Sequence, residues 1–210
     1  MTAPKPLLLL ACLVLLVSPA WAAPLRIVAL GDSLTAGYQL APTDAFPAKL
    51  QAALRAKGYD VEVVNAGVSG DTAANGLARL DWSVPAETDA VIVELGANDM
   101  LRGLDPARTR ATLAEILARL RARGLPVLLA GMRASPNLGP DYVAAFDAIF
   151  PDLARQYGAL LYPFFLDGVA LDRGLTLPDG LHPNAPGVDV IVARILPSVE
   201  ALMSRARPRA

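Results

Sequence analysis

The chain has 210 residues, of which 54% are hydrophobic and 19% charged, a balance typical of a single folded domain. Its 19 Lys and Arg residues are matched by 20 Asp and Glu residues, so the net charge of −1 gives no electrostatic basis for binding nucleic acid. A single cysteine and a single histidine exclude a disulfide framework and a His-rich metal site.

The first segment of the chain has the pattern of a secretory signal peptide. Lys5 precedes the uncharged apolar run 7–17, and residues 20–22 place alanine at the two positions that a signal peptidase reads. We therefore expect cleavage before Ala23, export to the periplasm or the medium, and no stable membrane anchor. A retained anchor is the alternative, but this run is shorter than the about 20 residues that span a bilayer. A lipoprotein would use Cys12, which lies too early in the run.

After this segment, short apolar strands alternate with amphipathic helices. The expected strands are residues 25–30, 61–64, 90–95, 127–130 and 159–162. The expected helices are residues 44–57, 72–80, 106–123, 141–157 and 188–205. Such alternation is typical of a parallel sheet with helices on both faces. The sequence therefore predicts one domain over residues 23–210, a three-layer α/β/α sandwich around a five-stranded parallel sheet.

Polar residues gather where the predicted strands end. In a parallel α/β sheet, ligands bind outside the carboxyl ends of the strands. The loops that follow the first three strands are residues 31–34, 65–71 and 96–99, and residues 179–183 precede the last helix. All four loops carry polar side chains or glycines, so we expect a functional site at this edge.

These loops contain the parts of a serine hydrolase. A serine hydroxyl needs a base within hydrogen-bonding reach and a carboxylate that fixes the tautomer of the base. His182 is the only histidine, Asp179 lies three residues before it, and Ser33 directly follows the first strand. Donors for a tetrahedral oxyanion could come from the Ser33 N–H, a backbone N–H of loop 65–71 and the Asn98 amide.

Each of these residues also has a purely structural explanation. Ser33 could cap a helix, Asn98 and Asp179 could form turns, and a single histidine in a loop is usually a surface residue. Their arrangement in ordered loops around one sheet edge favours the catalytic interpretation. The Gly-x-Ser-x-Gly motif of α/β-hydrolases is absent around Ser33.

Three aspartates accompany these residues: Asp32, Asp71 and Asp99. We expect a structural role for them, in which each carboxylate accepts hydrogen bonds from loop N–H groups and holds its neighbour in place.

The four blocks together resemble the SGNH (GDSL) hydrolase family. They are Gly-Asp-Ser-Leu at 31–34, the loop around Gly70, Gly-Ala-Asn-Asp at 96–99 and Asp-x-x-His at 179–182. Within that family the sequence is most similar to the bacterial periplasmic thioesterase I, arylesterase and lysophospholipase branch, also in stretches such as 76–80. The resemblance extends from about Leu25 to the last helix.

The resemblance implies a flavodoxin-like sheet and a set of site residues. Ser33 would be the nucleophile and His182 and Asp179 the other members of the triad. The Ser33 and Gly70 N–H groups and the Asn98 side chain would form the oxyanion hole, without a metal or cofactor. Gly67 departs from the pattern of some relatives, which leaves open which glycine of the loop faces the oxyanion.

The same resemblance implies a carboxylic ester hydrolase that acts on small-molecule or lipid acyl esters: aryl esters, acyl thioesters and lysophospholipids. We expect it to act as a monomer. Three apolar residues after Asn98 could line an acyl groove: Met100, Leu101 and Leu104. Met132 and Leu138, after the fourth strand, could join them. The alternative is that these side chains only cover the helix layer.

Two other functions stay open. One is a polysaccharide O-acetyl esterase, which aromatic residues at the rim would favour; Tyr38, Tyr142 and Trp82 are the obvious ones. The other is a non-catalytic periplasmic binding module that holds an anion at the helix start in residues 31–37. That module would leave the pairing of Asp179 with His182 unexplained.

Overall fold

The computed structural model describes residues 23–206, and the predicted signal segment lies outside this range. Five parallel strands form one sheet in the order β2-β1-β3-β4-β5. The strands are β1 (Leu25–Gly31), β2 (Val61–Gly67), β3 (Ala90–Glu94), β4 (Val127–Ala130) and β5 (Leu160–Tyr162). This is the predicted five-stranded α/β architecture, and the fold class is confirmed.

The register of the central strands aligns their carboxyl ends. Gly31 at the end of β1 pairs with Gly67 of β2 on one side and with Glu94 of β3 on the other. The loops that follow these strands therefore leave the sheet at the same level. This alignment brings the residues after β1, β2 and β3 to one edge.

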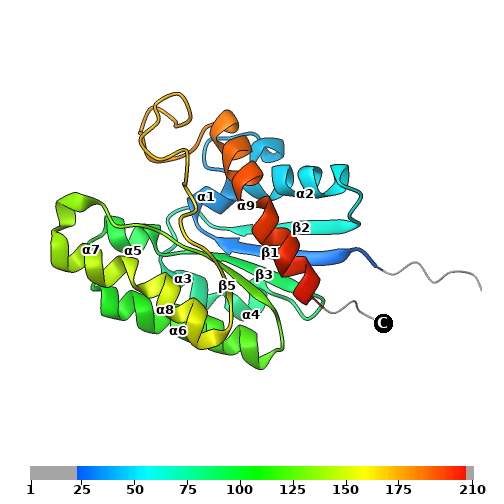
Figure 1. The fold of residues 1–210 in the computed structure, drawn as a ribbon, viewed down its shortest axis with the longest axis horizontal. Helices are drawn as coiled ribbons and strands as arrows, with labels where there is room; N and C mark the ends of the chain where they lie inside the picture. Colours follow the sequence, from blue (N-terminus) through cyan, green and yellow to red (C-terminus); the bar gives the residue numbers. More distant parts are fainter. Residues whose placement is uncertain (1–22, 207–210) are drawn as a thin grey trace, which may run out of the picture.

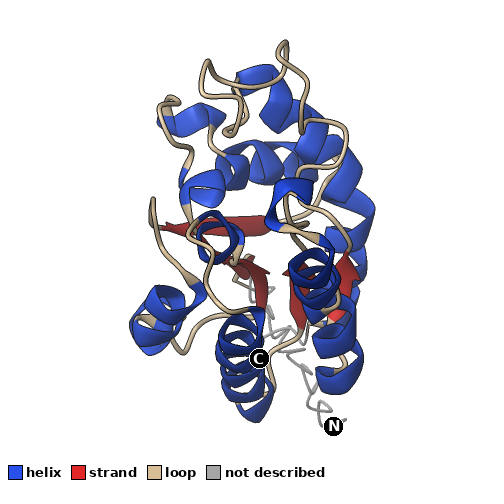
Figure 2. Cartoon of the chain, turned by 90° about the vertical axis from the view of Figure 1, so that its left-hand side faces the viewer, coloured by secondary structure: helices blue, strands red, loops and turns tan. Residues whose placement is uncertain are grey.

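Helices cover both faces of the sheet (Figures 1 and 2). One layer consists of α1 (Ser33–Ala36), α2 (Phe46–Ala56) and α9 (Ala185–Arg205), with the 3₁₀ turn η1 (Pro42–Asp44) before α2. The other side carries α3 (Ala73–Ala78), α4 (Leu80–Ser83), α5 (Ala97–Leu101), α6 (Pro106–Ala122), α7 (Pro140–Asp147) and α8 (Ile149–Tyr157), with η2 (Pro136–Leu138) before α7. The long loop between β5 and α9, orange in Figure 1, projects at the end of the molecule that carries α1.

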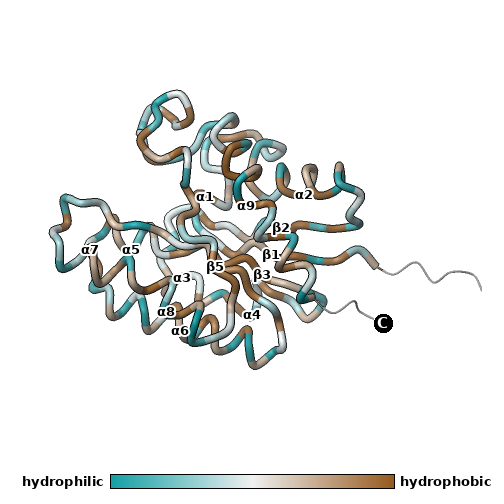
Figure 3. Tube along the Cα trace, viewed as in Figure 1, coloured by the Kyte–Doolittle hydropathy of each residue, from teal (hydrophilic) through white to brown (hydrophobic). Residues whose placement is uncertain are grey.

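The hydrophobic core lies between the sheet and these two layers. Ile27 and Leu30 of β1 and Ile92 of β3 are fully buried, and the strands form the apolar centre of the molecule in Figure 3. Strands covered on both faces read as continuous apolar runs rather than alternating ones. Phe46 from one helix layer and Phe146 from the other complete the core, both without solvent exposure.

One predicted helix is divided in the structure, so its prediction as a single helix was wrong, and another ends earlier than predicted. The helix predicted over 141–157 is α7 and α8, separated at Ala148. Pro151 lies in the first turn of α8, where a missing N–H costs least, but it could not have continued α7. The helix predicted over 72–80 ends at Ala78, and Arg79 separates it from α4.

Other helix and strand boundaries differ less from the predicted ones. The last helix begins at Ala185 rather than 188, because the Asn184 side chain caps it by accepting a hydrogen bond from the Gly187 N–H at 2.9 Å. The second strand extends to Gly67, beyond the predicted end at residue 64. Between residues 23 and 206, none of the helices is both long and apolar enough to cross a membrane.

Candidate active site

Ser33 lies at the carboxyl edge of the sheet, as the first residue of α1. Asp32 caps this short helix, with its carboxylate accepting a hydrogen bond from the Leu34 N–H at 3.0 Å. The cap fixes the turn between β1 and α1. The Ser33 side chain thus leaves the sheet edge next to the loops that follow the other central strands.

The last loop brings His182 to this serine. The Nε2 atom of His182 lies 2.9 Å from Ser33 Oγ, and its Nδ1 atom lies 2.7 Å from Asp179 Oδ2. The other carboxylate oxygen of Asp179 accepts hydrogen bonds from the N–H groups of Leu181 and His182, at 2.9 and 3.0 Å. The tight turn 179–182 thereby places carboxylate and imidazole side by side, as the spacing of three residues predicted.

The charge on Asp179 determines the tautomer of His182. Partial burial raises the pKa of Asp179, but the hydrogen bonds from His182 and Leu181 outweigh it and lower the pKa to about 2. Asp179 is therefore an ionised acceptor at neutral pH, so the proton of neutral His182 lies on Nδ1. Nε2 is then free to accept the Ser33 hydroxyl proton, which is the arrangement that general-base catalysis requires.

Two backbone N–H groups in the loops after β1 and β2 are available as donors. Among residues 23–206, no acceptor is hydrogen-bonded to the N–H of Ser33 or of Gly70. Gly70 has φ +87, a left-handed conformation that suits glycine, in the loop after β2. The N–H of Gly67, in contrast, donates to Asn65 Oδ1 at 3.0 Å, and a Cβ at Gly67 would overlap the backbone of Ala36. These contacts favour Gly70 over Gly67 as the oxyanion donor.

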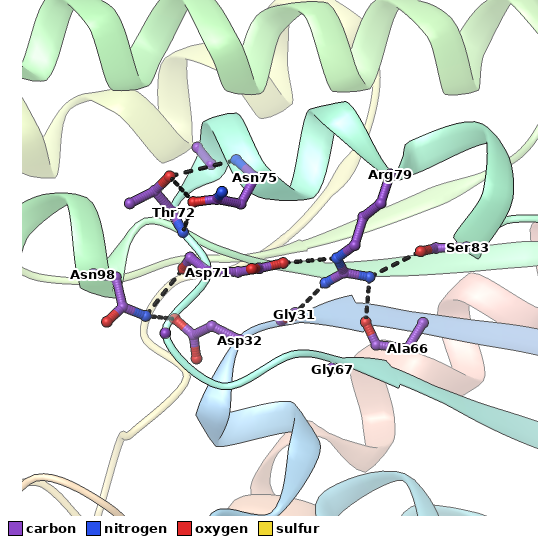
Figure 4. A network of polar contacts seen from close by, with 12 residues as sticks. Gly31, Asp32, Ala66, Gly67, Asp71, Thr72, Asn75, Arg79, Ser83 and Asn98 are labelled. Atoms are coloured by element: carbon purple, nitrogen blue, oxygen red, sulfur yellow. Dashed lines mark hydrogen bonds and ion pairs between the residues drawn. The ribbon is translucent and has the colours of Figure 1, made fainter.

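The Asn98 amide is held by two protein acceptors. Its Nδ2 donates to Asp32 Oδ2 and to the Asp71 carbonyl, both at 3.0 Å (Figure 4). Asn98 thus connects the turn before Ser33 with the loop that contains Gly70. To stabilise a tetrahedral oxyanion, the Asn98 amide would have to share one of these N–H groups with it. Such sharing is compatible with catalysis, because catalytic hydrogen bonds often reach their final geometry only in the transition state.

The three accompanying aspartates differ in their contacts. Asp32 accepts from the Leu34 N–H and Asp99 accepts from the Ala73 N–H at 2.8 Å, so the expected structural contacts are confirmed for these two. Asp71 was predicted wrongly. Its carboxylate binds the Arg79 guanidinium instead of a loop N–H, with 2.7 Å between Oδ2 and Nε.

The Glu94 carboxyl group contacts the turn that carries Ser33. Glu94 Oε2 accepts from Thr35 Oγ1 at 2.8 Å and from the Asp32 N–H at 3.3 Å, whereas Oε1 is buried without a hydrogen-bond partner among the described residues. Burial raises the pKa of Glu94 well above its usual range, and burial likewise raises the pKa of Asp32 to about 6. Removing carboxylates from water favours their protonated forms.

Two arginines missed by the sequence prediction contact the same loops. Arg79 donates to Asp71 and to the Gly31 carbonyl, the latter at 2.8 Å (Figure 4). Arg102 donates to the Gly70 carbonyl at 2.7 Å. The only sequence signal for Arg79 was its place in the stretch 76–80, because tertiary folding brings its partners together and two of them are backbone carbonyls.

An apolar pocket of about 450 Å³ adjoins Ser33 and His182. Met100, Leu101 and Met132 line it, as the predicted groove required. Leu104 and Leu138 do not line it, and the expectation for these two does not agree with the structure. The remaining apolar walls come mostly from the loop between β5 and α9 and the residues after β4: Ala134, Pro136, Phe164, Leu166, Ala170, Leu171 and Leu181.

Of the three aromatic residues expected at the rim, only Tyr38 contacts the site. Its ring centroid lies 4.5 Å from that of His182. The Tyr142 hydroxyl instead donates to the Leu104 carbonyl at 2.8 Å, and Trp82 lines a separate groove beyond β2. Of these three rings, only that of Tyr38 therefore lies against His182.

The helix start after β1 does not form an anion cradle. The Asp32 carboxylate already occupies the N-terminus of α1, which has four residues. Among the described residues, no group of three or more His, Cys, Asp or Glu side chains is arranged to hold a metal ion.

Comparisons with known proteins place this geometry in a family. Residues 29–190 match the model of the GDSL-like lipase/acylhydrolase family. The chain is 40% identical to esterase TesA of Pseudomonas aeruginosa over 95% of its length and 100% of that protein. It is 43% identical to thioesterase 1/protease 1/lysophospholipase L1 of Escherichia coli, over 82% of the chain and 81% of that protein. A crystal structure of TesA covers 84% of this chain, and 99% of its own, at a TM-score of 0.80 and 39% identity. The chain belongs to the GDSL-like lipase/acylhydrolase family.

Proposed function

We propose that this protein is a serine esterase and thioesterase that works through an acyl-enzyme on Ser33. The observation that carries the proposal is the continuous contact from Ser33 Oγ to His182 Nε2 at 2.9 Å and from His182 Nδ1 to Asp179 Oδ2 at 2.7 Å. The names of its relatives, an esterase and a thioesterase/lysophospholipase, support the same class of reaction.

In the acylation step, Ser33 Oγ attacks the acyl carbon and its proton moves to His182 Nε2. The carbonyl oxygen becomes an oxyanion, which the N–H groups of Ser33 and Gly70 and the Asn98 amide would stabilise. Collapse of this intermediate breaks the bond to the alcohol or thiol, which takes the proton from His182. Water then attacks the acyl carbon and gives a proton to His182. Collapse of the second intermediate returns this proton to Ser33 Oγ and releases the carboxylic acid.

The size and lining of the pocket favour substrates with acyl chains longer than acetyl. Its volume of about 450 Å³ and its wall of leucine and methionine side chains suit an extended hydrocarbon. Each buried methylene contributes about 0.8 kcal/mol, so discrimination would come chiefly from the acyl part. Aryl esters, acyl thioesters and lysophospholipids share such an acyl group and differ in the leaving group.

A substrate series on the purified full chain tests this function. We expect hydrolysis of p-nitrophenyl esters and acyl-CoA thioesters, with kcat/KM rising from acetyl to medium acyl chains. Ser33→Ala serves as the control for hydrolysis that does not depend on Ser33. Preference for acetyl esters, with release of acetate from acetylated xylan, would instead identify an O-acetyl esterase. Absence of all hydrolysis and of labelling by a fluorophosphonate would identify a binding module.

Export, cleavage before Ala23 and a monomeric state are further parts of the proposal. The basis for export is the charged start, the apolar run 7–17 and the alanines in residues 20–22. Cell fractionation followed by intact-mass measurement tests it, and a protein that retains residues 1–22 in the cytoplasm would contradict it. Sedimentation of the purified chain tests the monomer.

A further inference from the structure

We propose that Arg79 is a positioning residue for the oxyanion hole. Its guanidinium sets the spacing between the turn that carries Ser33 and the loop that carries Gly70. This inference rests on the oxyanion donors proposed above. It gives Arg79, a side chain outside the substrate pocket, the role of holding these donors in place.

Arg79 binds both of the segments that supply backbone donors. It separates α3 from α4, and its side chain is 16% exposed. The Nη2 atom donates to the carbonyl of Gly31, two residues before Ser33, at 2.8 Å. The Nε atom donates to Asp71 Oδ2, directly after Gly70, at 2.7 Å. One planar group therefore fixes two loops that come from adjacent strands (Figure 4).

Two further contacts fix the plane of the guanidinium itself. The Nη1 atom donates to the carbonyl of Ala66 near the end of β2 at 2.8 Å and to Ser83 Oγ in α4 at 2.9 Å. Four acceptors in different directions match the fork of donors that arginine presents. A lysine at this position would supply the charge at one point but could not reach all four acceptors.

The constraint extends from Arg79 to the third proposed donor. The Asp71 carbonyl accepts one hydrogen of the Asn98 amide at 3.0 Å, while Asp32 accepts the other. Asp71 is thus held through its side chain by Arg79 and holds Asn98 through its backbone. Without Arg79, a carboxylate that is only 12% exposed would lose its countercharge, and its loop would have to move toward water.

Arg79 does not line the acyl pocket beside Ser33. Its loss should therefore change the stabilisation of the transition state more than the binding of the acyl chain. An interaction that acts only in the transition state affects kcat and kcat/KM equally and leaves KM in place. This separates a positioning role from a contribution to substrate binding.

A groove of about 370 Å³ gives solvent access to Arg79. Its walls include Ala66, Gly67, Arg79, Trp82 and Ser83, and Trp82 is 85% exposed. Removal of the Arg79 side chain would extend this groove to the acceptors that the guanidinium now occupies. A free guanidinium ion could then enter and restore the same contacts.

The experiment compares Arg79→Ala and Arg79→Lys in the full chain with p-nitrophenyl butyrate. We expect kcat to fall by about 10²-fold in both variants, the loss typical of one oxyanion donor, with KM within about two-fold of the parent. Millimolar guanidinium chloride should restore kcat of Arg79→Ala by about ten-fold but should not restore Arg79→Lys. Urea at the same concentration controls for a solvent effect. Arg119→Ala, which removes a half-exposed arginine from the surface pair with Glu115, should retain full activity.

Several outcomes would overturn the proposal: an unchanged kcat, a rise in KM at constant kcat, or loss of activity that guanidinium does not restore. If Arg79→Ala does not fold, Asp71→Asn keeps the size of the partner and removes its charge, and it should show the same selective loss of kcat. The Ser33→Ala variant separates this inference from the proposed function. If that variant remains active, the proposed nucleophile is wrong, whereas failure of the Arg79 variants alone contradicts only the positioning role.

Discussion

His182 Nε2 lies 2.9 Å from Ser33 Oγ, although 149 positions of sequence separate the two residues. One follows the first strand and the other precedes the last helix. Ser33→Ala should lower kcat for p-nitrophenyl esters by at least about 10³-fold, because it removes the hydroxyl that is hydrogen-bonded to His182 Nε2. Circular dichroism should show an unchanged fold. Substantial activity in this variant would exclude Ser33 as the nucleophile.

Loss of the Asn98 amide should lower the rate without removing the nucleophile. We expect Asn98→Ala to reduce kcat by about 10²–10³-fold, equivalent to about 2.7–4 kcal/mol of transition-state stabilisation. Asn137→Ala, a change of an exposed asparagine in η2, is the matched control and should have no effect. A near-parental rate for Asn98→Ala would restrict the oxyanion hole to backbone donors.

The charge on Asp179 should persist far below neutral pH. Its pKa is lowered to about 2, so protonation of Asp179 cannot explain a loss of activity between pH 8 and 5. Asp32, whose pKa burial raises to about 6, takes up a proton within that range. Asp179→Asn should lower kcat by about 10³–10⁴-fold at pH 8, because the imidazole loses the acceptor that fixes its tautomer. A pH–rate profile of the parent that stays flat from pH 8 to 5 would argue against a histidine base.

The same depressed pKa affects stability. Asp179 contributes stability that is present above its unfolded value of 3.8 and is lost as the pH falls toward 2. Glu94 acts in the opposite direction: because its pKa is raised from 4.5, its contribution is present at acid pH and is lost as the pH rises. Glu94→Gln removes that ionisation. The difference between the urea midpoints at pH 4 and pH 8 should therefore be smaller in Glu94→Gln than in the parent. If the two proteins show the same difference, Glu94 is not protonated in the folded protein.

Chain-length preference should depend on the loop between β5 and α9. Ala170 is exposed and lines the pocket, so Ala170→Phe would fill part of it without disturbing the core. We expect kcat/KM for dodecanoyl esters to fall by about ten-fold, equivalent to the burial of about two methylenes, with acetyl esters unaffected. Trp82→Ala, in the separate groove, is the control. An equal loss for both chain lengths would indicate damage to the catalytic residues instead.

Local sequence determined most of the architecture. The mostly apolar runs at 25–30 and 90–95 indicated buried strands, because each is short, rich in β-branched residues and followed by a glycine. The turn that joins Asp179 to His182 was also predictable, since three residues suffice to bring carboxylate and imidazole together. The boundaries at Arg79 and Ala148 were missed, because a helical period continues across both positions although neither residue belongs to a helix in the structure.

Only the tertiary structure decided which polar groups act together. Sequence spacing could not show that Arg79 reaches the Gly31 carbonyl, or that the Asn98 amide is held between Asp32 and Asp71. Nor could it place Leu104 outside the pocket and Ala170 within it. Hydrogen bonds to backbone carbonyls leave no residue-type signature on the acceptor side, and pocket walls form from loops whose paths depend on the packed core. The sequence thus determined which residues could carry acyl transfer, and the parallel register of β1, β2 and β3 determined which of them meet.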